Sequence, residues 1–262
     1  PRHMSTARTT PPRLGTIEKL GYSLGDLAAN LIFQTLLTFI AFFYTDVYKV
    51  APGAAASIIF VGGIVGACFN PIMGLLADRT QTRWGKFRPW LLWTSIPFGL
   101  TALLAFSTPD LGERGKIVYA LLTYILLMLV YSANNLPYSA LSGVLTGNMA
   151  ERNSLSAYRF TAVMVAQFII QVLLLPLVLI AGGGDKARGF ENVMTVFAIV
   201  GTVFFLITFF TTRERVVPTP GQRSSIRQDI VDLLGNRPWV VMLVLTILVF
   251  ITLALKGGMY VF

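Results

Sequence analysis

The sequence predicts an all-α integral membrane protein, and its composition and its apolar runs carry this prediction. Hydrophobic residues make up 55% of the 262 residues and charged residues only 13%, against roughly 25% charged in soluble domains. A membrane-spanning helix needs about 20 mostly apolar residues, and seven charge-free runs of that order occur. They are continuous Leu, Ile, Val and Phe sequences without the alternation typical of membrane barrels, so we expect helices.

The predicted spans follow one another closely along the chain. They cover residues 27–45, 50–77, 89–109, 117–150, 160–184, 192–212 and 238–255. The fourth run is too long for one span, so we expect it to leave the membrane after the turn at Asn135–Pro137 and to continue along the surface.

The order of these spans predicts the domain organisation. We expect a tag remnant and cytoplasmic tail over 1–18, a six-helix half over 19–212, a cytoplasmic connecting loop over 213–237, and helix seven over 238–262. In the connecting loop, Ser225 with Gln228 predicts a capping box, so a short amphipathic helix competes with a partly ordered linker. This layout is that of a major facilitator N-terminal half, a 3+3 inverted repeat, plus helix seven.

The formal net charge of +9 is explained by topology rather than by nucleic-acid binding. Most Lys and Arg residues fall in the N-terminal tail and in the second, fourth and sixth loops. The positive-inside rule therefore places the N-terminus in the cytoplasm. We expect a multi-pass protein of the inner (plasma) membrane whose basic side contacts anionic membrane lipids.

Polar residues inside the spans are the candidates for function, because each costs free energy unless it is paired or faces water. Asp26, Asn30 and Gln34 share one face of the first span. The other candidates are Asn70, Ser132, Asn134, Asn135, Tyr138, Arg159 and Lys256. No metal cluster, phosphate loop or paired nucleophile and base is recognisable, so neither a cofactor nor an enzyme is expected.

Each candidate has a structural alternative. An intramembrane Asn commonly makes an interhelical hydrogen bond, Arg159 could extend to the membrane surface, and Tyr138 fits an aromatic belt as readily as a sugar-stacking role. For Lys256, a structural and a functional role remain open.

The loop between the second and third spans has the charge pattern of a gate. It contains the anion Asp78 among four cations, and the expected gate residues are Gly74, Asp78, Arg79, Arg83, Lys86 and Arg88. Asp78 can pair with arginines in one conformation and lose them in another, which is a bistable latch for alternating access. A solvated positive loop is the competing interpretation, although it leaves Asp78 and Gly74 unexplained.

Several strings together resemble the glycoside-pentoside-hexuronide:cation symporters of the major facilitator superfamily, a family that includes melibiose permease. The matching strings are residues 21–26, 43–47, 70–74, 83–89, 135–138, 158–160 and 236–239. The resemblance implies that Arg159 is a sugar-binding arginine. It also implies that Asn30 and Asn135 replace sugar-binding aspartates, and that Ser139 replaces a tryptophan that stacks on the sugar.

The resemblance also locates the cation site, at which this sequence departs from the family. The family's cation-coordinating aspartates align with Gly66 and Asn70, and Ser132 alone keeps a hydroxyl there. A site without carboxylates suits sodium poorly, so we expect either a facilitator or proton movement through another group such as Asp26.

The sequence therefore predicts a secondary transporter of a sugar or glycoside with atypical or absent sodium coupling. Two alternatives stay open: a lipid or amphiphile carrier, favoured by an apolar cavity, and a half-length non-transporting membrane module. Arg159 and Lys256, without nearby intramembrane carboxylates, would tolerate an anionic hexuronide. We expect the chain to be incomplete, with a C-terminal half or a second copy needed to close the cavity.

Overall fold

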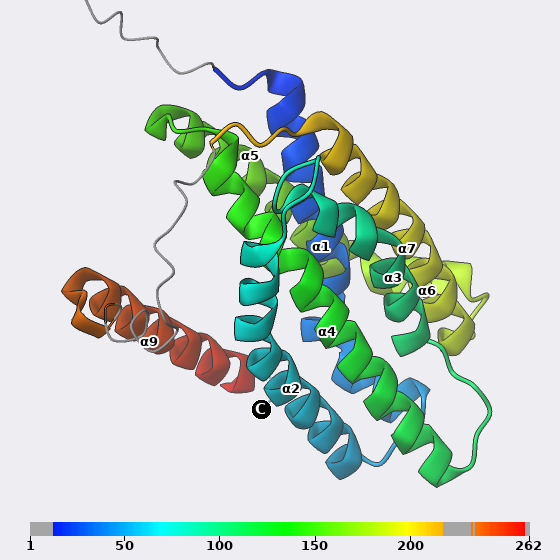
Figure 1. Cartoon of the computed structure of the whole chain (residues 1–262). Coiled ribbons are helices and arrows are strands. Elements are labelled where there is room, and N and C mark those ends of the chain that lie inside the picture. Colours follow the sequence, from blue (N-terminus) through cyan, green and yellow to red (C-terminus); the bar gives the residue numbers. More distant parts are fainter. Residues whose placement is uncertain (1–12, 217–231, 233, 260–262) are drawn as a thin grey trace, which may run out of the picture. The chain divides into compact units, whose positions relative to one another are not determined.

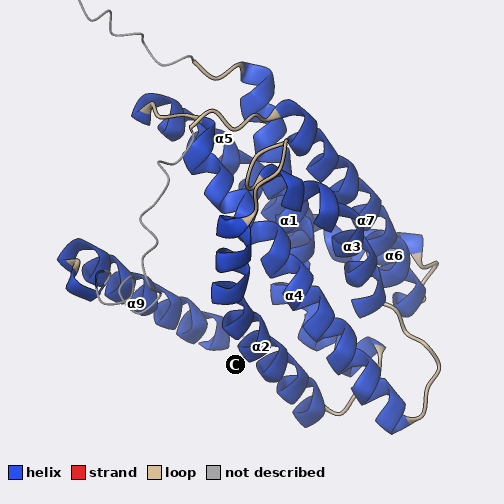
Figure 2. Ribbon diagram, in the orientation of Figure 1, coloured by secondary structure: helices blue, strands red, loops and turns tan. Residues whose placement is uncertain are grey.

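The computed structural model describes residues 13–216, 232 and 234–259, with side chains of the last helix through residue 249 and at residue 252. The described residues form helices joined by short loops, without a named strand among them (Figures 1 and 2). The helices are α1 (Thr16–Phe42) with η1 (Phe43–Val47), α2 (Pro52–Arg79), α3 (Arg88–Ala105), α4 (Glu113–Leu145), α5 (Met149–Phe168) with η2 (Ile169–Leu173) and α6 (Leu174–Ala181), α7 (Lys186–Thr211) and α9 (Arg237–Met259). The predicted all-α fold is confirmed.

Local sequence signals explain where several helices begin. Pro52 and Pro89 occupy the first turns of α2 and α3, where proline is tolerated because its missing N–H has no helical partner. The Asn148 side chain accepts a hydrogen bond from the Ala150 N–H at 2.9 Å and so caps α5. Asp185 caps α7 in the same way, as short polar side chains commonly do.

Five helical segments in the described part of the chain are long and apolar enough to cross a membrane. They are Thr16–Val47, Pro52–Arg79, Glu113–Leu145, Met149–Ala181 and Lys186–Thr211. The predicted third span is the 18-residue helix α3, which contains an arginine, two prolines and two tryptophans. The predicted seventh span is α9, whose apolar stretch within the described part runs over Arg237–Val249.

The predicted break in the fourth run is wrong, because α4 continues without interruption through Pro137 to Leu145. Proline removes one backbone hydrogen bond from a helix. Here the helix is held on both sides of it, since the neighbouring Asn134 and Tyr138 side chains are buried and bonded to other helices. Tertiary contacts thus overcome the local helix-breaking tendency.

The chain divides into two compact units, 1–217 and 218–262, and the first has an internal repeat. In that unit α1 packs on α5 and α7, whereas α4 packs on α2 and α3, and α3 packs on α7. Exchanging α1 with α4, α2 with α5, and α3 with α7 maps this set of pairs onto itself. Since consecutive spans alternate in direction, the second triplet is inverted, as predicted for a 3+3 repeat.

The second unit contains α9, which begins at Arg237. Most of the predicted amphipathic helix of the connecting loop, residues 224–235, lies outside the described residues; residues 232, 234 and 235 are described and are helical. The backbone of Lys256 belongs to α9, but its side chain also lies outside the described part.

Two neighbouring glycines of α2 allow a matched test of the packing between α2 and α4. A Cβ atom at Gly62 would lie 2.2 Å from the Tyr124 ring, whereas at Gly63 it would meet nothing within 4 Å. We expect Gly62→Ala to destabilise the protein by about 1–3 kcal/mol through overpacking. Gly63→Ala should be neutral or slightly stabilising because alanine favours the helix.

Thermal unfolding in detergent micelles, followed by circular dichroism, measures both variants. Equal unfolding midpoints for the two would contradict the close approach of α2 to α4 at Gly62.

Candidate substrate site and gate loop

Two tyrosines join α1 to α4 near one end of the bundle. The Tyr22 and Tyr138 rings stack with centroids 4.6 Å apart, and both side chains are completely buried. The Tyr22 hydroxyl donates to the Tyr138 carbonyl at 2.8 Å, and the Tyr138 hydroxyl donates to the Tyr22 carbonyl at 2.7 Å. The hydroxyl of Tyr138, a predicted substrate contact, is thus already hydrogen-bonded within the protein.

Arg159 of α5 covers this tyrosine pair and forms an ion pair with Asp26 of α1. Its Nε donates to Asp26 Oδ2. The guanidinium carbon lies 5.6 Å from the Tyr22 ring centroid and 5.4 Å from that of Tyr138, within the range of cation–π attraction. The Asp26 side chain is 7% exposed and that of Arg159 is 27% exposed, so a ligand can reach the arginine more easily than the aspartate.

The ion pair opens into a small pocket. A hollow of about 210 Å³ is lined by Asp26, Ser156, Arg159, Phe160 and Val163. Both charged groups and the Ser156 hydroxyl are therefore available to a polar ligand. Asp26 and Arg159 lie on different predicted spans, and the sequence analysis did not predict that their side chains pair.

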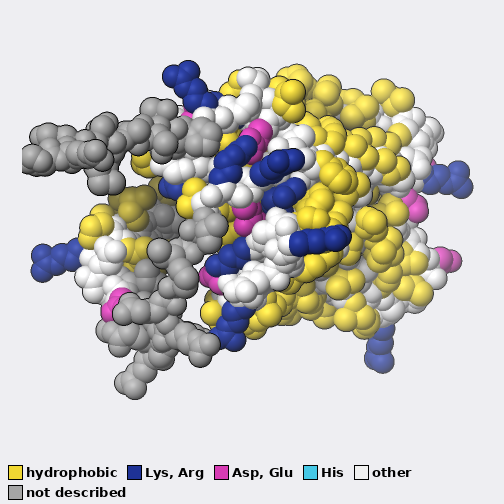
Figure 3. Space-filling model, turned by 45° about the horizontal axis from the view of Figure 1, so that its top comes forward, with side chains coloured by type: hydrophobic (Ala, Val, Ile, Leu, Met, Phe, Trp, Pro, Cys, Tyr) yellow, Lys and Arg dark blue, Asp and Glu magenta, His cyan; other side chains and the backbone are white. Residues whose placement is uncertain are grey.

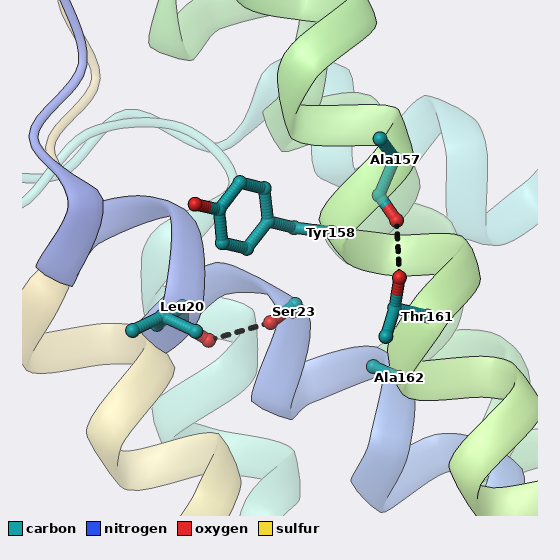
Figure 4. Close-up of a pocket in the computed structure, with 6 residues that line it drawn as sticks. All are labelled: Leu20, Ser23, Ala157, Tyr158, Thr161 and Ala162. Atoms are coloured by element: carbon teal, nitrogen blue, oxygen red, sulfur yellow. Dashed lines mark hydrogen bonds between the residues drawn. The ribbon is translucent and has the colours of Figure 1, made fainter.

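A second hollow lies on the opposite face of α5. It measures about 390 Å³ and is lined by Leu20, Ser23, Ala157, Tyr158, Thr161 and Ala162 (Figure 4). The Ser23 and Thr161 hydroxyls donate to the carbonyls of Leu20 and Ala157 within their own helices. The lining left to a ligand is therefore mainly apolar.

The predicted asparagines do not gather at one place. The Asn30 amide lies one turn beyond Asp26 and donates to the Asp26 carbonyl at 2.9 Å. Asn135 is half-buried and, within the described part of the chain, its side chain makes no hydrogen bond. Asn134 instead is buried and faces α3, donating to Thr94 Oγ1 at 2.8 Å, so it lies apart from Arg159.

The residues aligned with the family's cation site lie along the contact between α2 and α4. Gly66 packs against Met128, since a Cβ atom there would lie 3.3 Å from Met128 Cβ. Asn70 lies one turn beyond Gly66 in α2, and Ser132 lies one turn beyond Met128 in α4. The same pairing of the two helices therefore places Asn70 level with Ser132, which is buried. Asn70 is exposed. The donors along this line are thus one amide and one hydroxyl, without a carboxylate.

The gate loop leads from the last turns of α2 to the start of α3, and its single carboxylate, Asp78 of α2, pairs with a lysine. Lys86 Nζ lies 2.8 Å from Asp78 Oδ1, and the Asp78 side chain is 65% exposed. The partner is thus not one of the arginines expected from the sequence. Arg83 stacks on Trp84, 4.5 Å from its ring centroid, while Gly74 and Arg79 belong to the last turns of α2.

Arg88 is the arginine of this loop that reaches another helix. Its Nη2 donates to the Phe209 carbonyl of α7 at 2.7 Å, and its Nη1 donates to the Trp84 carbonyl at 3.2 Å. Arg88 thereby neutralises the carbonyl-rich end of α7, where a cation is favourable.

Glu214, just after α7, is a key residue that sequence reasoning missed. Its carboxylate accepts hydrogen bonds from the backbone N–H groups of Lys86, Phe87 and Arg88 at 2.7–3.0 Å. These groups precede or begin α3, and a helix start attracts anions through its dipole and free N–H groups. Gly85 permits the approach, because its φ is +112° and a Cβ atom there would lie 2.4 Å from the Glu214 carboxyl carbon.

The residues around Glu214 form a strap, defined here as residues 212–216, across this end of the bundle. Arg215 makes two hydrogen bonds to Glu18, at 2.7 and 2.8 Å, which raise the pKa of the Arg215 guanidinium above its usual value. The backbone N–H groups of Arg215 and Val216 both donate to the Val144 carbonyl at 2.9 Å. Acidic and basic side chains gather over this end, and hydrophobic side chains cover the adjoining flank (Figure 3).

Two inverted helix triplets, in which five of the six segments are long and apolar enough to cross a membrane, with a charged loop between the second and third helices, define a membrane protein of the major facilitator type. Residues 21–262 match the MFS/sugar transport protein family, and the chain belongs to this family. The resemblance to glycoside and pentoside symporters is thereby confirmed.

Curated relatives agree with this assignment. The chain is 41% identical over 245 residues to the inner membrane symporter YicJ of Escherichia coli K12, covering 94% of this chain and 53% of that protein. It is 38% identical over 229 residues to the isoprimeverose transporter of Lactiplantibacillus pentosus, covering 86% and 48%. A glucuronide carrier protein homolog of E. coli K12 is 34% identical over 220 residues, covering 84% and 48%. The chain spans about half the length of these relatives.

The strap allows a test in which the loss of Glu214 is compared with the loss of Asp78. Glu214→Ala leaves three N–H groups at the start of α3 without their acceptor, and we expect a loss of about 1–2 kcal/mol in the free energy of unfolding. Asp78→Asn breaks an exposed pair and should cost at most about 1 kcal/mol.

Detergent-solubilised protein and thermal unfolding suffice for this comparison. Equal, small shifts for the two variants would show that Glu214 does not anchor the gate loop.

Proposed function

We propose that this chain provides a substrate-binding half of a secondary transporter, which moves a sugar or glycoside across the membrane by alternating access. The observation that carries the proposal is the Asp26–Arg159 pair at the wall of a pocket. A carboxylate accepts and a guanidinium donates hydrogen bonds, so the pair offers complementary partners to neighbouring sugar hydroxyls. The family assignment supports the same class of substrate.

The ion pair changes the expected charge of the substrate. The expectation that the site would tolerate an anionic hexuronide assumed that no intramembrane carboxylate lies near Arg159. That assumption was wrong, because Asp26 pairs directly with Arg159. A neutralised arginine attracts an anion less strongly, so we favour an uncharged sugar. Among the relatives, the name of the isoprimeverose transporter denotes such a sugar, whereas that of the glucuronide carrier homolog denotes an anionic one.

A lipid or amphiphile carrier remains the second candidate, and the larger hollow between α1 and α5 favours it. That hollow is mainly apolar (Figure 4) and suits an acyl chain better than a sugar. We rank it second because the chain belongs to a family of sugar transport proteins. The family's sugar-binding arginine instead aligns with Arg159, in the smaller pocket.

We propose further that the N-terminus is cytoplasmic and that sodium is not the coupling ion. The Lys and Arg distribution favours the orientation. At the aligned cation positions, Gly66 has no side-chain donor and Asn70 and Ser132 carry no charge, whereas sodium favours carboxylate and carbonyl oxygens. Enclosing a substrate also requires a second half or a second copy, since the aligned segment is about half of each relative.

Arg159→Gln tests the substrate site. Removing a charged hydrogen-bond donor costs about 1.5–3 kcal/mol, so isoprimeverose affinity should fall by roughly 10-fold to 150-fold in equilibrium binding. Arg188→Gln is the matched control, because Arg188 lies in the first turn of α7 at the other end of the bundle and its side chain is 81% exposed. Unchanged affinity in Arg159→Gln would leave Arg159 as a purely structural residue.

Radiolabelled isoprimeverose uptake into proteoliposomes that hold the chain together with its second half or second copy tests the ion dependence. We expect the same initial rate with an inward sodium gradient as with an equal potassium gradient at constant membrane potential, because the aligned positions carry no carboxylate. Strong stimulation by sodium would refute the proposed absence of sodium coupling while leaving sugar transport intact.

A further inference from the structure

The smaller pocket is lined along α5 by four residues that share one face of the helix. Ser156, Arg159, Phe160 and Val163 follow the spacing i, i+3, i+4 and i+7, which brings side chains together on a helix surface. Asp26 of α1 completes the lining. The pocket therefore has a polar part, formed by Asp26, Arg159 and Ser156, beside an apolar part formed by Phe160 and Val163.

Phe160 presents an uncovered aromatic ring to this pocket. It is 67% exposed, and among the described residues no second ring packs against it. Tyr158, two residues earlier, instead lines the hollow on the opposite face of α5 (Figure 4). An acyl chain that covered Phe160 from within the pocket would also cover the ion pair, which is unfavourable for charged groups. A ligand with both polar and apolar surface suits this lining better.

The other aromatic rings near the ion pair are already occupied. Tyr22 and Tyr138 stack on each other and are completely buried. Phe33 and Tyr131 stack on each other with centroids 4.8 Å apart. Phe160 is therefore the ring that a ligand in the smaller pocket can reach among those that the structure describes.

The ion pair leaves hydrogen-bond donors free for a ligand that lies against Phe160. An arginine side chain has five N–H donors, and Arg159 uses its Nε and one Nη2 N–H on Asp26. The remaining donors make no hydrogen bond within the described part of the chain. Hydroxyl oxygens of a ligand can therefore accept from Arg159 while the pair with Asp26 stays intact.

Resting on the proposed sugar transport, we propose that Phe160 is a stacking residue for the sugar ring. A pyranose with equatorial hydroxyls, such as that of glucose or xylose, has its hydroxyls around the rim and C–H groups on both faces. The rim hydroxyls bond to Arg159 and Ser156, and one C–H face covers the Phe160 ring. Ligand pockets commonly combine such an aromatic surface with a few placed polar groups.

This arrangement assigns the ring contact to α5. On α4, Ser139 stands at the position where the resemblance implies a stacking tryptophan, and a serine offers no flat apolar surface. Phe160 and Arg159 are neighbours in sequence, so one turn of one helix presents both the stacking surface and the hydrogen-bond donors. The proposed substrate class is therefore a sugar with at least one exposed C–H face.

Equilibrium binding of isoprimeverose, measured on the chain together with its second half or second copy, compares the same substitution at two phenylalanines of α5. Phe160→Leu keeps an apolar side chain but removes the flat ring, so affinity should fall roughly 3-fold to 10-fold. Phe168→Leu is the matched control and should bind as the wild type does. Phe168 lies two turns further along α5, is 58% exposed and is not part of the pocket lining.

Phe160→Trp gives a second readout that a purely structural role would not produce. The indole should preserve or improve affinity, and its fluorescence, taken as the difference from the wild type with its four tryptophans, should change as the sugar binds. Phe160→Leu should leave the unfolding midpoint and the assembly with the second half unchanged, as checked by thermal unfolding and size-exclusion chromatography.

The possible outcomes separate this inference from the proposed function. Unchanged isoprimeverose affinity in Phe160→Leu would overturn the stacking role and leave sugar transport standing. Weaker binding that accompanies weaker assembly would also overturn it, by assigning the Phe160 ring to the contact with the second half. Failure of the wild type to bind either isoprimeverose or a glucuronide would overturn both proposals.

Discussion

The contact between Tyr22 and Tyr138 is the constraint on which the rest of the first unit depends, because it joins the two helices around which the others are arranged. Helices α5 and α7 pack on α1, and helices α2 and α3 pack on α4. Two buried hydrogen bonds, each worth about 1 kcal/mol, and one aromatic stack worth about 0.5–1.5 kcal/mol fix their separation. Arg159 lies on the outer side of this contact, so the same two rings set the position of the charged site.

The strap has the corresponding role at the gate loop, where cations from several loops would otherwise repel one another. Glu214 neutralises the start of α3, Glu18 neutralises Arg215, and Asp78 neutralises Lys86. The backbone of the strap also bonds to Val144 at the end of α4. Four helices are therefore connected at this end by charge-assisted and backbone hydrogen bonds, in a region where apolar packing is limited by the charged sequence.

Much of the fold could be predicted from the sequence, because apolar runs of membrane length have few structural solutions. The pairing of side chains could not. Arg159 and Asp26 are 133 residues apart, and Glu214 and Phe87 are 127 apart, so only the packed structure brings them together. Local rules also misplaced the end of α4, since the helix-breaking tendency of Pro137 was weaker than the burial of Asn134 and Tyr138. A signal for the ion pair was present, because α1 contains one aspartate, Asp26, and α5 has an arginine, Arg159, deeper in the helix than Arg152.

Glu18 and Asp26 are two carboxylates of α1 that form the same kind of ion pair in different surroundings. Both are buried carboxylates paired with arginine. Glu18 accepts three hydrogen bonds from Arg213 and Arg215, and both donors belong to a strap that is fixed at several points. Such a pair resists exchange and acts as a clamp. Asp26 instead accepts from Arg159 alone among the described residues, and the pair lies at the wall of a pocket, so a ligand can compete with Asp26 for the guanidinium.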